Sequence, residues 1–255
     1  MIELTHLTKR FGDLVAVDDL TLTVPRGELF ALLGPNAAGK TTTIRLITGL
    51  LRPTAGQVCV AGFDVQRQPL EARRRLAYVP DIPFLYDKLT PAEFFRFTGQ
   101  LFRLGEKQLQ TDARALTDQF GLEPFLDKPI EGLSQGTRQR VTIVSALLHA
   151  PEVFVLDEPM VGLDPHHSRV LKNLLKDQAR RGVTILISTH QLAVAEELAD
   201  RVGIMHRGRL IAVGTRDDLR RQTGHDGALE QTFLALTSSD AGVSTAPGAV
   251  GAITS

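Results

Sequence analysis

The sequence contains little or none of what several classes of protein depend on. Its single cysteine, Cys59, excludes an internal disulfide framework and a zinc site built from several cysteines, and it fits a reducing compartment. The 29 Lys and Arg residues balance the 29 Asp and Glu residues, and a formal net charge of zero argues against binding nucleic acid through overall positive charge. No apolar run approaches the roughly 18 residues that span a bilayer. The opening MIELTHLTKRFGD lacks the apolar stretch of a secretory signal. These absences predict a soluble, cytosolic globular protein.

The 255 residues, 43% of them apolar, are enough for one domain with a substantial core, or for one domain with an inserted subdomain. Short apolar runs alternate with longer amphipathic ones, which is typical of βαβ units and predicts a parallel sheet with helices on both faces. The expected strands are 27–34, 153–156 and 183–188, and the expected helices run from Gly39 to about Leu51, over 166–180 and over 191–199.

Other regions depart from this pattern. The first 30 or so residues and 57–62 alternate apolar and polar positions, as antiparallel strands do. Residues 91–149 have helical periodicity, and Thr90 followed by Pro91 is a good helix start. Residues 202–214 predict a hairpin that turns at Arg207-Gly208. The fold class is therefore α/β, with a parallel sheet core, an N-terminal antiparallel β subdomain and an α-helical subdomain inserted at about 84–150. Residues 237–255 carry one charge and no aromatic residue, and they predict a disordered tail.

The first expected strand leads into a loop with the pattern G-x-x-x-x-G-K-[ST], which marks the fold as a P-loop NTPase. Small residues let backbone N–H groups converge on phosphate, and the following helix directs its positive dipole end at the same anion. Lys40 is expected to reach the terminal phosphates of ATP, and the Thr41 hydroxyl to bind Mg²⁺. The expected nucleotide-binding residues of the loop are Gly34, Pro35, Asn36, Ala37, Ala38, Gly39, Lys40, Thr41 and Thr42.

The apolar strand at 153–156 runs into Asp157-Glu158-Pro159. Ligands of open α/β sheets bind at the carboxyl ends of the strands, so Asp157 is predicted to hold Mg²⁺ there. Glu158 is then placed to orient and deprotonate a water beside the γ-phosphate. The simpler alternative is an acidic turn that caps the next helix.

Leu133-Ser134-Gln135-Gly136, with the apolar helix after it, resembles the signature sequence of ABC-transporter ATPases, usually L-S-G-G-Q. Further elements of that family follow in order, and the resemblance covers about residues 1–236. It implies that Phe11 stacks on adenine, that Asp164 belongs to the D-loop and that His190 is the switch histidine beside the γ-phosphate. Each residue also has a structural alternative: Ser134 as a helix cap, Phe11 in the core, Asp164 as a turn former and His190 as a structural strand-end residue.

Ser134 and Gly136 stand at a helix N-terminus, which is a second anion site in a chain that already has a phosphate loop. Such a second site suggests use in trans. The resemblance implies the same: two copies dimerise head to tail, and each ATP lies between one phosphate loop and the partner's signature residues Ser134, Gln135 and Gly136.

Three positions depart from the family pattern. Ala37 stands where glycine is usual, and a positive φ there would cost about 1 kcal/mol or more. Asp81 stands where the family usually has the Q-loop glutamine. A carboxylate binds Mg²⁺ more strongly than an amide but repels the γ-phosphate, and the alternative is a turn residue between two prolines. Gln135 replaces the first glycine of the signature, while Gly136 is retained for close backbone approach.

The segments 89–105 and 228–237 resemble exporter ATPases of the drug, antibiotic and polysaccharide type. This implies an ATPase at the inner face of the cell membrane that powers export through a separate permease. Five apolar residues are expected either to dock that permease or to form the subdomain's own core: Phe84, Leu85, Tyr86, Phe94 and Phe95.

Two other functions stay open at this point. A soluble ABC-type ATPase acting on ribosomes or DNA would usually carry paired ATPase domains or long coiled-coil arms, which this sequence lacks, and no nucleic-acid partner is expected. A non-hydrolysing nucleotide-binding regulatory module is motivated by Ala37 and Asp81. Intact Lys40, Glu158 and His190 argue against it.

Overall fold

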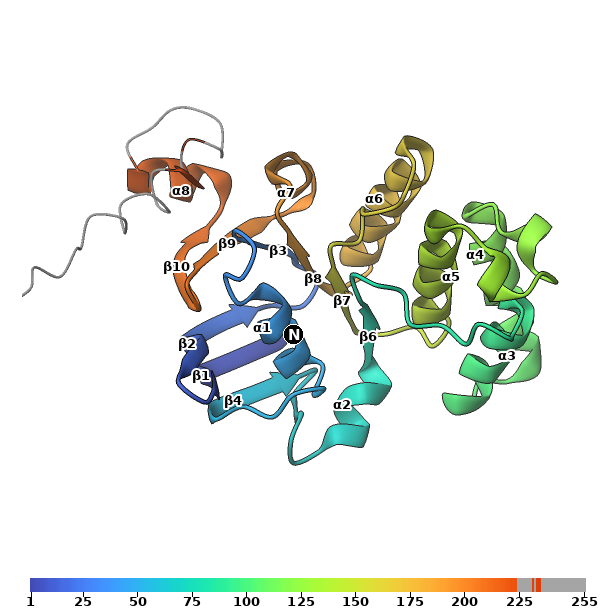
Figure 1. The fold of residues 1–255 in the computed structure, drawn as a ribbon, viewed down its shortest axis with the longest axis horizontal. Coiled ribbons are helices and arrows are strands. Elements are labelled where there is room, and N and C mark those ends of the chain that lie inside the picture. Colours follow the sequence, from blue (N-terminus) through green and yellow to red (C-terminus); the bar gives the residue numbers. More distant parts are fainter. Residues whose placement is uncertain (224–230, 232, 235–255) are drawn as a thin grey trace, which may run out of the picture.

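The computed structural model describes residues 1–223, 231 and 233–234 (Figure 1). Within these residues the framework consists of a four-stranded sheet and a six-stranded sheet. The predicted tail at 237–255 lies outside the described residues, as does most of the segment 228–237.

The four-stranded sheet is antiparallel throughout, in the order β2-β1-β4-β5. Buried and exposed residues alternate along β2, so one face of the sheet packs on the core. This confirms the antiparallel pattern predicted for the N-terminal region. The strands are β1 (Ile2–Phe11), β2 (Leu14–Val24), β4 (Ala55–Val60) and β5 (Phe63–Asp64).

The six-stranded sheet has the order β10-β9-β3-β8-β7-β6 and is parallel except for the β9–β10 hairpin. Every residue of β3, β7 and β8 is buried, as expected of strands covered on both faces. The sequence did not indicate β6, because it is only four residues long and follows a helix directly. The strands are β3 (Leu29–Leu33), β6 (Leu76–Val79), β7 (Val153–Asp157), β8 (Thr184–Thr189), β9 (Arg201–His206) and β10 (Arg209–Gly214).

Among the described residues, five helices accompany the two sheets. Helix α1 ends at Ile47, earlier than the predicted Leu51, because Gly49 adopts a left-handed φ of 68° and stops the helix. Helices α2 and α8 had not been expected from the sequence. The bounds are α1 (Lys40–Ile47), α2 (Pro69–Arg75), α6 (Pro165–Arg180), α7 (Leu192–Leu198) and α8 (Arg216–Thr223).

Helices α3, α4 and α5 lie together at the side of the molecule away from the four-stranded sheet (Figure 1). Helix α3 begins as predicted, with a capping box between Thr90 and Glu93. The helical content of 91–149 is lower than expected, because prolines interrupt the stretch between α4 and α5, which holds two short 3-10 helices. The elements are α3 (Pro91–Leu101), α4 (Glu106–Gln119), η1 (Glu123–Phe125), η2 (Ile130–Gly132) and α5 (Gln135–Leu147).

The core lies in two layers on opposite faces of the six-stranded sheet. Along β3, Phe30 and Leu32 join a cluster with α1 and the antiparallel sheet, whereas Leu29, Ala31 and Leu33 join a cluster with α3 to α8. The sheet is thus rigidly held on both sides, and its carboxyl edge becomes a fixed platform for the residues that follow each strand.

Candidate nucleotide-binding site

The loop between β3 and α1 needs glycine at both ends. A Cβ on Gly34 would lie 2.5 Å from the Met205 carbonyl oxygen, and one on Gly39 would lie 2.5 Å from the Ala16 carbonyl oxygen. Gly39 also has a φ of 106°, which side chains disfavour. The loop is therefore pressed between strand β2 and the β9–β10 hairpin, and only glycine fits these two positions.

Ala37 adopts a φ of 63°, in the left-handed region. A positive φ at this position was one expectation from the sequence, and it costs an L-residue about 1–2 kcal/mol. The loop forms nevertheless, with Gly39 and Lys40 in place.

Lys40 is buried at the start of α1. Its ammonium Nζ donates to the Gly34 carbonyl over 2.7 Å and to the Pro35 carbonyl over 3.1 Å. Burial lowers the pKa of Lys40, and the nearby carboxylates of Glu158 and Asp157 oppose that effect. A cation is thus held over the loop, facing two acidic side chains from another strand.

Asp157 ends strand β7 and is only 1% exposed. Ser188, its register partner on β8, donates its hydroxyl to Oδ1, whereas Oδ2 has no hydrogen-bond partner within the described part of the chain. Burial raises the pKa of Asp157, and the Ser188 and Thr41 hydroxyls oppose the shift. A buried carboxylate oxygen without a partner is costly, so Oδ2 is suited to a cation that the protein itself does not supply.

Glu158 and His190 follow the neighbouring strands β7 and β8. Glu158 has a φ of 47°, and its backbone N–H donates to the Ser188 carbonyl over 3.0 Å. Its Oε1 lies 2.8 Å from Nδ1 of His190. The parallel register of β7 and β8 brings both side chains to the same edge of the sheet, which neither sequence segment shows alone.

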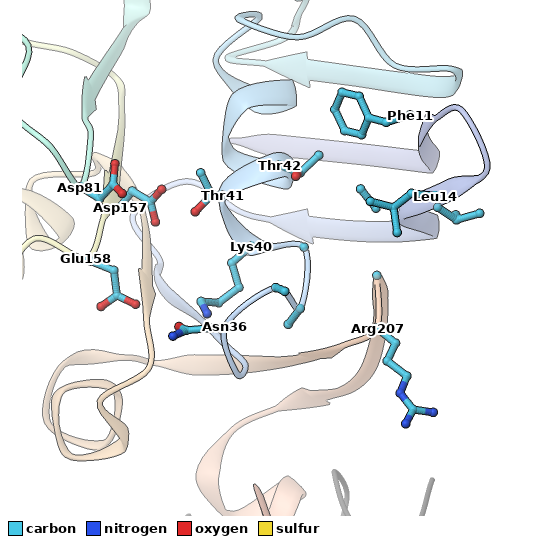
Figure 2. Close-up of a pocket in the computed structure, with 16 residues that line it drawn as sticks. Phe11, Leu14, Asn36, Lys40, Thr41, Thr42, Asp81, Asp157, Glu158 and Arg207 are labelled. Atoms are coloured by element: carbon cyan, nitrogen blue, oxygen red, sulfur yellow. The ribbon is translucent and has the colours of Figure 1, made fainter. Parts of the chain in front are cut away.

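Lys40, Asp157 and Glu158 border a cavity of about 590 Å³, whereas the predicted site residues Gly34, Pro35 and His190 do not line it (Figure 2). Asp81, Asp157 and Glu158 lie at one end, Lys40 near the middle and Phe11 at the other end. Phe11 is 47% exposed, so it is not a core residue. Predicted site residues that line the cavity are Phe11, Asn36, Ala37, Ala38, Gly39, Lys40, Thr41, Thr42, Asp81, Asp157 and Glu158.

Asp81 borders the cavity but also behaves as a turn residue. Its Oδ1 accepts a hydrogen bond from the Ile82 backbone N–H over 2.9 Å. Both interpretations made from the sequence therefore stay compatible with its position.

Sequence reasoning missed part of the cavity wall. Leu14, Val15 and Ala16 of β2 and Arg207 and Gly208 of the β9–β10 turn also line it. The turn is fixed there, because the Gly208 N–H donates to the Ala38 carbonyl over 2.9 Å and its carbonyl accepts from Asp18 N–H over 2.9 Å. The sequence predicted a hairpin turn at Arg207-Gly208 but gave no indication that this turn contacts the phosphate loop.

The signature residues do not line the cavity of their own chain. Ser134 caps α5, and Asp164 caps α6 by accepting from the His167 N–H over 3.0 Å. A Cβ on Gly136 would lie 2.4 Å from the Gly162 carbonyl oxygen, so only glycine allows this approach. The structure therefore brings Ser134, Gly136 and Asp164 together as a second polar surface.

A comparison with known families finds that residues 17–161, more than half of the chain, match the ABC transporter family. The chain belongs to this family. Its fold agrees with that assignment. A solved "ATP binding subunit of ABC transporter" superposes with a TM-score of 0.89 at 37% identity, covering 92% of this chain and 99% of that one.

Two curated relatives represent the family well. The chain is 35% identical over 224 residues to the ABC transporter ATP-binding protein NatA of Bacillus subtilis (strain 168), covering 86% of this chain and 91% of NatA. It is 38% identical over 240 residues to the probable multidrug ABC transporter ATP-binding protein YbhF of Escherichia coli (strain K12). That match covers 92% of this chain but only 41% of YbhF.

Proposed function

We propose that the chain hydrolyses Mg·ATP and thereby powers export through a separate membrane permease. The observation that carries the proposal is the Glu158–His190 pair, 2.8 Å apart, in which Glu158 lines the acidic end of the cavity that contains the phosphate loop. Charged and polar groups from three separate segments converge there. That arrangement suits phosphoryl transfer to water, in which positioning and electrostatics supply most of the catalysis.

The cavity gives ATP one orientation. The phosphates lie on the loop, where Lys40 exchanges its carbonyl partners for phosphate oxygens, and the adenine stacks on Phe11 at the opposite end. Lys9 lies with its Nζ 4.9 Å from the centre of the Phe11 ring and keeps one face of that ring covered.

The residues present fit Mg²⁺. Asp157 offers a buried carboxylate oxygen that has no hydrogen-bond partner in the described part of the chain, and the Thr41 hydroxyl lies beside this carboxylate. Asp81 is a third oxygen donor at the same end. Within the described residues, no cluster of three or more His, Cys, Asp and Glu side chains is placed to hold a metal alone, so this ion would share phosphate oxygens. When bound, it neutralises charge that develops on the phosphates.

Glu158 orients the attacking water and accepts its proton. His190 holds the carboxylate through Nδ1 and turns its remaining nitrogen to the γ-phosphate. Because Glu158 is mostly shielded and His190 is half exposed, the pair is accessible from the side on which a second subunit would close.

The second polar surface, at Ser134, Gly136 and Asp164, lies outside the cavity and suits use in trans. We infer a head-to-tail homodimer in which each ATP is enclosed by one phosphate loop and the partner's signature. Two dimeric ATP-binding cassettes, one in a post-hydrolysis state bound to ADP and Pi, superpose with a TM-score of 0.77 at 24% and 25% identity. The likeness is one of fold, and it supports the proposed dimer.

The names of relatives favour export. They include a linearmycin resistance ATP-binding protein of Bacillus subtilis (strain 168) and a Nod factor export ATP-binding protein of Rhizobium meliloti. No helix among the described residues is both long and apolar enough to cross a bilayer. The names of the relatives lead us to assign the transmembrane path to a partner permease, with this chain acting at the inner face of the membrane.

A groove lined mainly by β6, the segment 80–86, α3 and α5 suits the permease. It has a volume of about 770 Å³, and Phe84, 90% exposed, and Tyr86 line it. Phe94 and Phe97 contact Tyr86 edge-on, with ring centres 6.0 and 5.4 Å away. Phe95, in contrast, is buried in the subdomain core, which agrees with the core alternative stated for it and not with the docking one. An amphipathic helix of the permease would fill this groove.

The test is Glu158→Gln, measured by phosphate release with Mg·ATP. We expect turnover to fall at least about 100-fold, because the amide cannot accept the proton from water, while ATP binding persists. His206→Gln, outside the cavity, is the control and should retain turnover. Unchanged hydrolysis in the Glu158→Gln protein would refute the assignment.

A further inference from the structure

A chain of hydrogen bonds links the D-loop residue Asp164 to the signature residue Ser134 through three side chains that no motif identifies. Asp164 Oδ2 lies 2.6 Å from His167 Nδ1, and His167 Nε2 lies 2.9 Å from Arg140 Nη1. Arg140 Nη2 donates to Thr137 Oγ1 over 3.0 Å, and Thr137 Oγ1 lies 2.8 Å from Ser134 Oγ. This series of hydrogen bonds joins the N-terminal ends of α5 and α6.

The direction of each bond follows from the donors available. A guanidinium only donates, so Nε2 of His167 must accept from Arg140 and carries no proton. The proton of the neutral ring is then on Nδ1, which donates to Asp164. The backbone N–H and the side chain of His167, with a smaller contribution from the backbone N–H of His166, lower the pKa of Asp164 to about 2, which keeps this carboxylate an acceptor. His167 is thus held in one tautomer by partners on both sides.

The hydroxyl of Thr137 determines the direction of the hydrogen bond to Ser134. This hydroxyl is buried and accepts from Arg140, and within residues 1–223 its proton has only Ser134 Oγ to bond. Leaving a buried donor unsatisfied is costly, so Thr137 donates to Ser134. Ser134 Oγ also accepts from the Thr137 backbone N–H over 3.3 Å. With its oxygen occupied, the exposed Ser134 hydroxyl directs its own proton outward, as a hydrogen-bond donor for an anion.

We propose that His167 is a positioning residue that sets this polarity. By accepting from Arg140 it keeps the guanidinium on Thr137, and by donating to Asp164 it ties the D-loop to the signature helix. Arg140 is anchored on its other side by the Phe120 carbonyl, over 2.6 Å. The inference rests on the proposed function, because the anion is taken to be a phosphate of the ATP bound to a second copy of this chain.

His167→Asn and His167→Gln separate the two bonds. The shorter amide reaches the position of Nδ1 and retains the donor to Asp164, whereas the carbonyl oxygen of the longer amide reaches the position of Nε2 and accepts from Arg140. Both are made in the Glu158→Gln protein, which accumulates the ATP-bound state. The neighbouring His166, exposed on the same helix turn, supplies the control His166→Asn.

The measurement is the ATP concentration that gives half-maximal dimer in analytical ultracentrifugation. We expect His167→Asn to raise it about tenfold, roughly the loss of one charge-assisted hydrogen bond, and His167→Gln and His166→Asn to stay within about threefold of the parent. The affinity of the isolated monomer for a fluorescent ATP analogue should not change, since Ser134 acts only on the partner's nucleotide, and this binding also reports folding.

Equal midpoints for the Asn and Gln proteins would overturn the role of His167, and so would a parallel loss of monomer binding. If the parent Glu158→Gln protein binds ATP but never dimerises, the trans site itself is wrong and the inference falls with it. If the parent dimerises and the His167→Asn protein has the same midpoint ATP concentration, the role of His167 is refuted while the proposed trans site stands.

Discussion

Asp157→Asn tests whether this carboxylate is kept in the folded protein at a cost to stability. The side chain is almost wholly buried, and its Oδ2 lacks a hydrogen-bond partner within the described residues. Asparagine retains an oxygen that can accept from Ser188 and removes the charge. A charged acceptor that is buried without a partner costs about 1–3 kcal/mol, so the nucleotide-free variant should be more stable than the wild type by about 1 kcal/mol or more.

The gain must depend on pH. Burial raises the pKa of Asp157 in the folded state above its ordinary value of 3.8, so the folded protein binds this proton more tightly than the unfolded chain. The wild-type free energy of unfolding therefore falls as the pH rises from 3.8 through the folded-state pKa. The advantage of Asp157→Asn should be complete above that pKa and should vanish as the pH approaches the unfolded value.

Calorimetry of the nucleotide-free proteins at several pH values measures the effect. At neutral pH we expect Tm to rise by about 2 °C or more, given 2–4 °C for each kcal/mol in a chain of this size. Asp13→Asn, an exposed carboxylate in the β1–β2 turn, is the control and should change stability by less than about 0.5 kcal/mol. A lower Tm for Asp157→Asn, or a gain that does not depend on pH, would refute the reasoning.

Two further predictions concern the loop and the groove. Ala37→Gly should stabilise the protein by up to about 1 kcal/mol in thermal unfolding, because glycine adopts the φ of 63° without strain, although its greater freedom in the unfolded chain offsets part of the gain. Ala38→Gly, at a buried position without positive φ, should destabilise the protein. Equal effects of the two would contradict the strain argument. Phe84→Asp should leave ATP hydrolysis unchanged and weaken binding of the detergent-solubilised permease about tenfold or more. The control Leu70→Asp, at an exposed position of α2, should change neither hydrolysis nor permease binding. Intact permease binding by the Phe84→Asp protein would place the interface elsewhere.

Much of the candidate site was predictable because its chemistry is local in sequence. The loop from Gly34 to Thr41 can be recognised from its residue types and their spacing, and the family is shown by residues 17–161. The strand preceding Asp157 was also visible, because strands buried on both faces are apolar throughout. The short strand β6 and helix α2 were not predicted, since elements of four and seven residues leave too little periodicity to recognise.

Other features depend on contacts between distant segments. The proximity of Glu158 and His190 follows from the β7–β8 register, and the Arg207–Gly208 turn reaches the cavity because Gly208 bonds the Ala38 carbonyl. The structural alternatives for Phe11 and Phe95 had the same status in the sequence. Exposure decided them in opposite directions, because it depends on what packs against a ring and not on the ring itself.

The sequence by itself determined the class of chemistry: a phosphate loop, an acidic strand end, a signature segment and a family. Tertiary structure alone decided which groups meet. Among the described residues, it left Asp157 Oδ2 without a hydrogen-bond partner, placed Ser134 outside its own chain's cavity and gave His167 one partner on α5 and one at the N-cap of α6. The physical reason is that residue identity sets which bonds a group can form, whereas the packing of helices and strands sets which of those bonds are available.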